Sequence, residues 1–193
     1  TYGEMDELRR KYEEALACPD VVGLVIGTRP DCMPDELLDY LTALAGHTYV
    51  MIEYGLESTL DRTLRQINRG HTHAESEDAI RRTHARGLPV GVHLILGLPG
   101  ESRDEMLHHA DVLSALPIKL HQLQIIRHTA MGREYEAYPE RFRLFTVDEY
   151  IDLVVAFRRR LRPDILIERY VSQAPKEWLL APDWGLKNYQ FEA

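Results

Sequence analysis

The chain has 193 residues, of which 45% are apolar, and a formal net charge of -8 at pH 7. This length suffices for one domain with a substantial core, and this composition excludes an intrinsically disordered chain. The acidic balance argues against these residues alone gripping a nucleic-acid backbone. Two cysteines are too few for a disulfide framework or a four-cysteine metal site. Because no apolar run reaches the length of a membrane span, we expect a cytoplasmic protein with no membrane partner.

The first half of the chain predicts strands that alternate with amphipathic helices. Apolar side chains three and four residues apart indicate helices, and short continuous apolar runs indicate buried strands. Pro34 suits the first turn of one helix, and Ser58 is expected to cap another. In chain order, the expected elements are a helix over 4–17, a strand over 21–27, a helix from Pro34 to Leu44, a strand over 48–54 and a helix that follows Ser58 and carries Leu60, Leu64 and Ile67.

The second half repeats this alternation. In chain order, it predicts a helix over 75–86 that stops at Gly87, a strand over 90–97, a helix over 101–116, a strand over 118–126, a polar loop over 127–145, a helix over 147–162 capped by Thr146 and a strand over 165–170. The strands are apolar on both faces, as in parallel sheets covered by helices. We therefore predict an α/β fold in a single domain over residues 1–193. Five strands are too few for a closed eight-stranded barrel.

Ionisable residues gather near the carboxyl ends of the predicted strands, where parallel α/β folds bind ligands. Arg29 and Asp31 follow the first strand, Glu57 follows the second, and His93 lies inside the third. Each also has a purely structural interpretation: a loop ion pair, a favourable charge near a helix N-terminus, and a hydrogen-bonded core histidine. Arg69 either complements the dipole at a helix C-terminus or presents its guanidinium to a carboxylate.

Four segments in order resemble the radical SAM superfamily. They are Gly27-Thr28-Arg29-Pro30-Asp31-Cys32, Glu53-x-Gly55-Leu56-Glu57-Ser58, Ile67-Asn68-Arg69-Gly70-His71 and His93-Leu94-Ile95-Leu96-Gly97-Leu98-Pro99-Gly100-Glu101. The chain looks most similar to an uncharacterised bacterial branch of that superfamily. That branch is similar to the catalytic subunit of Elongator and, more distantly, to oxygen-independent coproporphyrinogen oxidase.

The resemblance implies a partial (β/α) barrel with parallel strands. The chain would be a fragment that lacks the first strands of a (β/α)6 radical SAM core. It would carry about the third to the sixth strand and a C-terminal extension. The family's C-x3-C-x2-C loop, which holds a [4Fe–4S] cluster, is not matched by Cys18 or Cys32. We therefore expect no metal ligands among these residues, a cluster bound by an upstream segment, and no activity from this fragment alone.

The resemblance also assigns residues to S-adenosylmethionine (SAM). Arg69 matches the family arginine that pairs with the methionyl carboxylate, which suits a bidentate guanidinium. Glu57 stands where relatives usually carry glutamine near the same methionyl group. His93 stands where the coproporphyrinogen enzyme has an aspartate that reaches SAM.

Three further residues complete the predicted SAM site. Thr28 and Arg29 lie close to Gly27, which replaces a glutamate that relatives use on the SAM side of the strand. The loss of that glutamate removes one expected contact. Gln124 lies near the end of a later strand, where relatives contact adenine largely through the backbone.

The implied reaction is reductive cleavage of SAM to a 5'-deoxyadenosyl radical, which abstracts a hydrogen atom from a substrate. An electron donor such as flavodoxin or ferredoxin would reduce the cluster. The substrate is either a small molecule or RNA. The likeness to the Elongator subunit favours RNA, whereas the acidic charge gives that choice no support.

Two other functions stay open from the sequence. The chain could be a fragment of a different (β/α) barrel enzyme such as an aldolase, which would need a Schiff-base lysine at a strand end. Lys119 is the only lysine in a predicted strand and lies early in it. Alternatively, the chain could be a non-catalytic binding module that never held a cluster.

Overall fold

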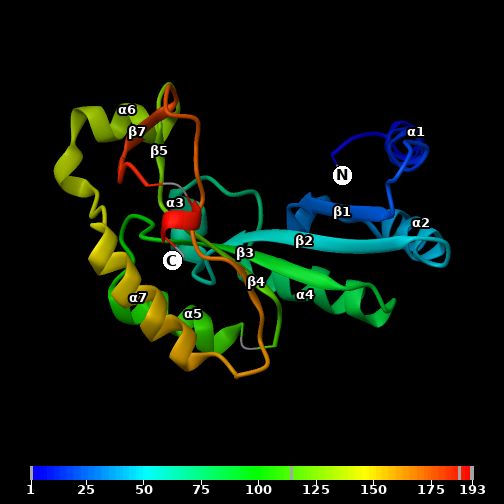
Figure 1. The fold of residues 1–193 in the computed structure, drawn as a ribbon. Coiled ribbons are helices and arrows are strands. Elements are labelled where there is room, and N and C mark those ends of the chain that lie inside the picture. Colours follow the sequence, from blue (N-terminus) through cyan, green and yellow to red (C-terminus); the bar gives the residue numbers. More distant parts are fainter. Residues whose placement is uncertain (1, 114, 187, 192–193) are drawn as a thin grey trace. The chain divides into compact units, whose positions relative to one another are not determined.

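The computed structural model describes residues 2–113, 115–186 and 188–191 (Figure 1). The chain divides into two compact units, Thr1–His93 and Leu94–Ala193. The boundary falls inside one strand, β3 (Val90–Leu96). Among the described residues, no helix combines the length and the apolar character needed to cross a bilayer.

The first unit alternates helices with parallel strands. In chain order its elements are α1 (Met5–Leu16), β1 (Gly23–Thr28), the 3-10 helix η1 (Pro30–Cys32), α2 (Asp35–Ala45), β2 (Tyr49–Glu57), α3 (Asp61–Gln66), α4 (His73–Ala85) and the first part of β3. Strands β1 and β2 pair in parallel, with Ile26 opposite Ile52 and Gly27 opposite Glu53. Their carboxyl ends therefore emerge at the same edge.

Strand β2 is buried on both faces, because residues 50–54 are all buried. One face packs against α4, where the Tyr54 hydroxyl lies 2.8 Å from Thr83 Oγ1. Since side chains alternate along a strand, Glu53 projects from the opposite face. This alternation places a carboxylate, rather than a phenol, at the edge that the predicted site occupies.

The second unit combines two small groups of strands with helices. In chain order its elements are the last part of β3, α5 (Arg103–Val112), β4 (Ile118–Gln122), β5 (Ile125–Ile126), α6 (Ala130–Ala137), η2 (Pro139–Arg141), α7 (Val147–Arg160), β6 (Ile167–Arg169), β7 (Leu179–Ala181) and α8 (Asn188–Phe191). Strands β4 and β6 are parallel, whereas β5 and β7 are antiparallel. The buried ring of Tyr150 on α7 contacts Phe145, Trp184 and Phe191.

The main sheet has the strand order β1-β2-β3-β4-β6, and β5 and β7 form a separate two-stranded sheet. This arrangement confirms the predicted α/β class with a parallel sheet. The prediction of a single domain over 1–193 stays a prediction.

Several predicted boundaries are wrong in the second unit. The expected strand over 118–126 is two strands, because the chain leaves the main sheet after Gln122 and β5 pairs with β7 instead. The expected loop over 127–145 contains α6. Thr129 begins this helix, since its hydroxyl accepts a hydrogen bond from the Gly132 amide at 2.9 Å. The expected helix over 101–116 spans only α5, which starts after the capping box of Ser102 and Glu105.

Helix starts also differ in the first unit. Ser58 does not cap α3 directly, because Leu60 occupies the cap position and the Ser58 hydroxyl accepts from the Leu60 amide at 3.1 Å. Pro34 stands at the cap of α2 rather than inside its first turn. Helix α4 begins two residues before the predicted position, because Thr72 and Glu75 form a capping box.

Candidate functional site

Five of the six predicted SAM-binding residues line one open depression in the first unit. It lies at the carboxyl ends of β1, β2 and β3 and has a volume of about 290 Å3. Its lining residues are Gly27, Thr28, Arg29, Glu53, Gly55, Glu57, Arg69 and His93. Thr28, Arg29, Glu57, Arg69 and His93, which the sequence interpretation assigned to one site, thus lie together, and Glu53, which it did not assign, lies with them.

Arg69 reaches the depression because helix α3 ends in a Schellman motif. The Arg69 amide donates to the Leu64 carbonyl at 2.8 Å, and the Asn68 amide donates to the Arg65 carbonyl at 3.1 Å. Asn68 has the left-handed conformation, with φ of 57°, that this motif requires. The chain therefore reverses direction at Asn68 and presents the Arg69 side chain to the carboxyl end of β2.

One nitrogen of the Arg69 guanidinium is hydrogen-bonded, whereas another has no hydrogen-bond partner among the described residues. Its Nη2 donates to the Gly55 carbonyl at 2.7 Å and lies 3.3 Å from Glu57 Oε1. Its Nε is buried and has no hydrogen-bond partner among the described residues. A buried donor without a partner is costly, so the guanidinium suits a ligand that carries an acceptor such as a carboxylate.

Gly55 leaves the room that this arrangement needs. A Cβ atom at Gly55 would lie 2.7 Å from Glu57 Oε1 and 3.2 Å from Arg69 Nη2. Both distances are shorter than an ordinary van der Waals contact, so a side chain would displace the ion pair. The motif Glu53-x-Gly55 therefore has glycine at position 55 for a steric reason: a larger side chain would collide with Glu57 and Arg69.

Glu57 stands at a sharp turn at the end of β2. The Ser58 amide donates to the Leu56 carbonyl at 2.8 Å, and Glu57 between them has a φ of 66°. These features define a classic γ-turn, which is rare and strained for a residue with a side chain. Burial raises the pKa of the Glu57 carboxyl, and Arg69 and His93 only partly oppose this effect. Glu57 therefore holds its proton more readily than an ordinary glutamate does.

Glu53 and His93 form a close pair across β2 and β3. His93 Nε2 lies 3.0 Å from Glu53 Oε2, and the Glu53 side chain is only 9% exposed. His93 is thus a hydrogen-bonded histidine that also lines the depression, so the structural and the functional interpretations of this residue coexist. A carboxylate within the apolar run of β2 was the sequence signal that could have identified Glu53.

Arg29 is held by the loop that contains it. Its guanidinium donates twice to the Asp31 carboxylate, with 3.0 Å between Nε and Oδ1, which raises the pKa of Arg29. Gly70 lies against the same guanidinium, because a Cβ there would come within 2.7 Å of Nη2. The expected loop ion pair is therefore present, and Arg29 contributes to the depression with much of its charge already balanced.

His71 lies beneath this edge as a buried and uncharged ring. Its side chain is fully buried, and neither ring nitrogen has a hydrogen-bond partner among the described residues. Burial lowers the pKa of His71, and the positive charge of Arg69 lowers it further. His71 therefore adds no positive charge to the depression at neutral pH.

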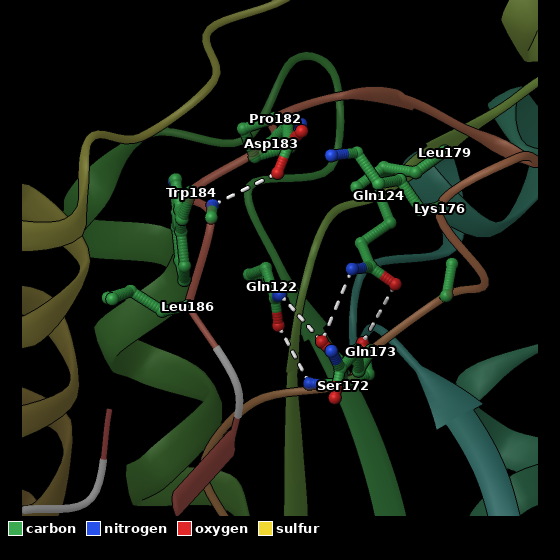
Figure 2. A pocket seen from close by; sticks show the side chains of 12 residues that line it. Gln122, Gln124, Ser172, Gln173, Lys176, Leu179, Pro182, Asp183, Trp184 and Leu186 are labelled. Atoms are coloured by element: carbon green, nitrogen blue, oxygen red, sulfur yellow. Dashed lines mark hydrogen bonds between the residues drawn. The ribbon is translucent and has the colours of Figure 1, made fainter. Parts of the chain in front are cut away.

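Gln124 lies elsewhere, in the second unit. It lines a separate cavity of about 250 Å3 formed by residues that follow β4, β6 and β7. Figure 2 shows Gln122 and Gln124 both turned toward Ser172. Gln122 exchanges two hydrogen bonds of 2.8 Å with the Ser172 backbone, and Gln124 Nε2 donates to the Ser172 carbonyl at 3.2 Å. Gln124 is therefore not among the residues that line the depression.

The described residues do not fit an iron–sulfur cluster. Cys18 is exposed, Cys32 is half-buried, and both are free thiols. Within the described ranges, no group of three or more Cys, His, Asp or Glu side chains could hold a metal ion. The donor set of the depression instead fits an organic ligand with a carboxylate and hydrogen-bonding groups.

The fold and the site together define a parallel α/β protein with an ionic ligand-binding edge. Comparison with known families places it further. Residues 1–113 match the Radical SAM superfamily, and residues 117–193 match the Radical SAM C-terminal domain. The chain therefore belongs to the radical SAM superfamily, as the motifs indicated.

Curated relatives include several uncharacterised microbial proteins. The chain is 34% identical to YtqA of Bacillus subtilis over 98% of its own length and 59% of the relative. It is 36% identical to MJ0486 of Methanocaldococcus jannaschii over 96% of the chain and 59% of that protein. Mouse Elongator complex protein 3 is 28% identical over 86% of the chain and 30% of the relative. The chain thus spans about three fifths of the uncharacterised relatives that it matches.

Solved structures share the fold. An Elp3 from Methanocaldococcus infernus superposes with a TM-score of 0.72 at 21% identity, covering 82% of this chain and 38% of the other. The radical SAM methyltransferase TsrM from Kitasatospora setae, solved with cobalamin and a [4Fe-4S] cluster, gives 0.55 at 21% identity over 72% of this chain and 28% of TsrM. The resemblance to the Elongator branch is therefore confirmed, and the α/β fold matches part of a radical SAM core.

Proposed function

We propose that this chain forms the SAM-binding portion of a radical SAM enzyme. The observation that carries the proposal is the Arg69 guanidinium, which is held by Gly55 and keeps a buried, unpaired Nε. SAM has a methionyl carboxylate, and a guanidinium recognises a carboxylate through paired charge-assisted hydrogen bonds. Membership of the radical SAM superfamily supports the same ligand.

The other lining residues have complementary tasks in this proposal. Glu57, which lies 3.3 Å from Arg69, offers its carboxyl oxygens as hydrogen-bond acceptors near the methionyl group. Thr28 and His93 offer polar groups to the rest of the ligand. Arg29 adds a positive edge whose charge is largely balanced by Asp31. These residues bind and orient SAM and exclude water from it.

The remaining chemistry comes from groups that these residues do not supply. A [4Fe–4S] cluster, whose thiolate ligands would lie outside the described residues, would supply the reductive cleavage of bound SAM. The proposal includes a flavodoxin or ferredoxin as electron donor, a small molecule or RNA as substrate, and a cytoplasmic location. Gln124 is proposed as a separate contact to the adenine end of SAM.

An aldolase-like function is disfavoured by Lys119. Its ammonium lies 3.2 Å from the Glu168 carboxylate, and the side chain is largely buried. A Schiff-base lysine needs to reach a ligand at the carboxyl end of a strand, whereas Lys119 is the second residue of β4 and is held in an ion pair with Glu168. A non-catalytic binding module remains the competing function, and only an activity measurement separates it from an enzyme.

The test uses the complete protein that contains this chain. It is reconstituted anaerobically with iron and sulfide, supplied with SAM and dithionite, and assayed for 5'-deoxyadenosine. Accumulation of 5'-deoxyadenosine supports the enzyme. A fully assembled cluster with no SAM binding by calorimetry would refute the proposal and favour the module. In parallel, the isolated chain is expected to bind no iron under the same conditions.

A further inference from the structure

Glu53 is the most deeply buried acid of the depression. It lies in the middle of an apolar run on β2, and its side chain is 9% exposed. Burying a carboxylate is costly unless hydrogen bonds compensate. The close partner is the imidazole of His93, with 3.0 Å between Oε2 and Nε2. The site therefore keeps a carboxylate in a position where stability alone would favour an apolar side chain.

The space next to Glu53 is open on its own face of the sheet. Gly27 is the register partner of Glu53 on β1, and a Cβ atom at Gly27 would meet nothing within 4 Å. Paired residues on parallel strands project to the same face. Glu53 and His93 thus border room for a ligand rather than a packed neighbour on that side.

The Glu53 carboxylate restricts which ring nitrogen of His93 carries the proton. An ionised carboxylate only accepts hydrogen bonds, so the His93 nitrogen that faces it must carry a proton. In the neutral imidazole the proton then sits on Nε2, and Nδ1 has the acceptor lone pair. A carboxylate that sets the tautomer of an imidazole in this way alters what the imidazole can recognise without touching the ligand.

We propose that Glu53 is a positioning residue that holds His93 in the Nε2–H tautomer, and that this fixed imidazole contributes to ligand binding in the depression. The ligand part rests on the proposed function, because it takes SAM as the ligand. The tautomer part stands by itself, because it concerns the protein without ligand. A glutamine at position 53 would present an amide instead, which can donate to Nε2 and favour the opposite tautomer.

The first experiment reads the tautomer directly. Nitrogen-15 spectra of histidine-labelled complete protein are recorded without ligand, and His93→Gln identifies the His93 signals among those of the other histidines. The expected result is a single Nε2–H form that becomes mixed or inverted in Glu53→Gln. An Nδ1–H form in the wild type, or a Glu53→Gln spectrum identical to the wild type, would overturn the proposal.

The second experiment measures SAM affinity by calorimetry. Glu53→Gln is expected to weaken binding about tenfold to hundredfold, the range of a hydrogen bond that involves a charged group. Glu53→Asp, which keeps the carboxylate, is expected to lose less. In a His93→Gln background, Glu53→Gln is expected to add less than about twofold, since coupled residues are not additive. Full additivity would mean that Glu53 does not act through His93.

Tyr54→Phe is the matched control. Tyr54 is the next residue on β2, equally buried, and it bonds to Thr83 from the opposite face of the strand. Loss of that hydrogen bond tests general damage to β2, and SAM affinity is expected to stay within about twofold of the wild type. If the wild type itself binds no SAM, the proposed function fails while the nitrogen-15 spectra still decide the role of Glu53.

Discussion

The depression in the first unit and the cavity in the second unit both have polar side chains in their lining, but these side chains differ in how they are hydrogen-bonded. In the cavity, the side-chain amides of Gln122 and Gln124 form hydrogen bonds to Ser172. In the depression, Arg69 Nε has no partner within the described part of the chain, and Glu57 is buried with a raised pKa. The amides in the cavity thus have hydrogen-bond partners within the protein, whereas Arg69 Nε in the depression has none among the described residues.

This difference separates polar groups that hold the fold from polar groups that await a ligand. A buried group with all its hydrogen bonds contributes to stability, and its loss destabilises the protein. A buried group that lacks a partner costs stability and is compensated only when a ligand arrives. Substitutions in the two regions should therefore change different measured quantities.

The largest effect is expected from Arg69→Ala in the complete protein. SAM affinity should fall about hundredfold, because a charge-assisted bidentate interaction with a carboxylate is worth about 3 kcal/mol. Calorimetry measures the affinity, and thermal melting checks the fold. Affinity within threefold of the wild type would mean that the guanidinium does not hold the carboxylate.

Gln122→Ala tests the cavity of the second unit, where the glutamine amide is hydrogen-bonded within the protein. The Ser172 amide would lose its acceptor, so the free energy of unfolding should fall by about 1–3 kcal/mol while SAM cleavage by the folded protein changes little. Gln124→Ala is the matched control, because its bonds to Ser172 are longer, at 3.2 and 3.4 Å, and should contribute less. Urea unfolding measures the free energy of unfolding of both variants. Equal losses would contradict the expectation that Gln122 contributes more than Gln124.

Gly55→Ala and Gly27→Ala sharpen the comparison within the depression itself. A methyl group at Gly55 pushes Arg69 and Glu57 apart, so SAM affinity should fall about tenfold, a cost of about 1.4 kcal/mol. A methyl group at Gly27 would meet no protein atom within 4 Å, so it should leave stability nearly unchanged and lower SAM affinity less than Gly55→Ala does. If calorimetry ranks the two glycines in the reverse order, the steric explanation of Gly55 fails.

The smallest effect is expected from Glu57→Gln, and its sign depends on pH. An acid whose pKa is higher in the folded state binds more protons there, so its contribution to stability is lost as pH rises from about 4.3 through the folded pKa. Glutamine removes that loss. The variant should thus gain stability relative to the wild type as the pH rises above about 4.3, with SAM affinity within about threefold. Urea unfolding that shows the opposite trend would contradict the raised pKa.

The sequence predicted the regular elements of the first unit well because each has a strong periodic pattern. Strands β1, β2 and β3 are continuous apolar runs, and α2 carries leucines at helical spacing. Prediction was poorer in the second unit, where the signals are short. Helix α6 has only eight residues and includes Gly132, and β5 is a two-residue strand that pairs with β7, more than fifty residues later in the sequence.

The site was predictable in part for the same reason. Arg69 and Glu57 follow local motifs, and their neighbourhood follows from the parallel register of β1 and β2. Glu53 escaped assignment because its role depends on the distance to His93, forty residues later, which no local pattern encodes. Gln124 was grouped with the others by resemblance alone, and the structure places it in a different cavity.

The γ-turn at Glu57 also bears on how this protein could be re-engineered. A left-handed residue with a side chain costs of order 1 kcal/mol, and glycine would relieve that cost. A variant library sorted only for thermal tolerance should therefore enrich Glu57→Gly and discard the acid of the depression. A library sorted for ligand capture should retain a side chain there. Position 57 is thus a place where two kinds of directed evolution would diverge.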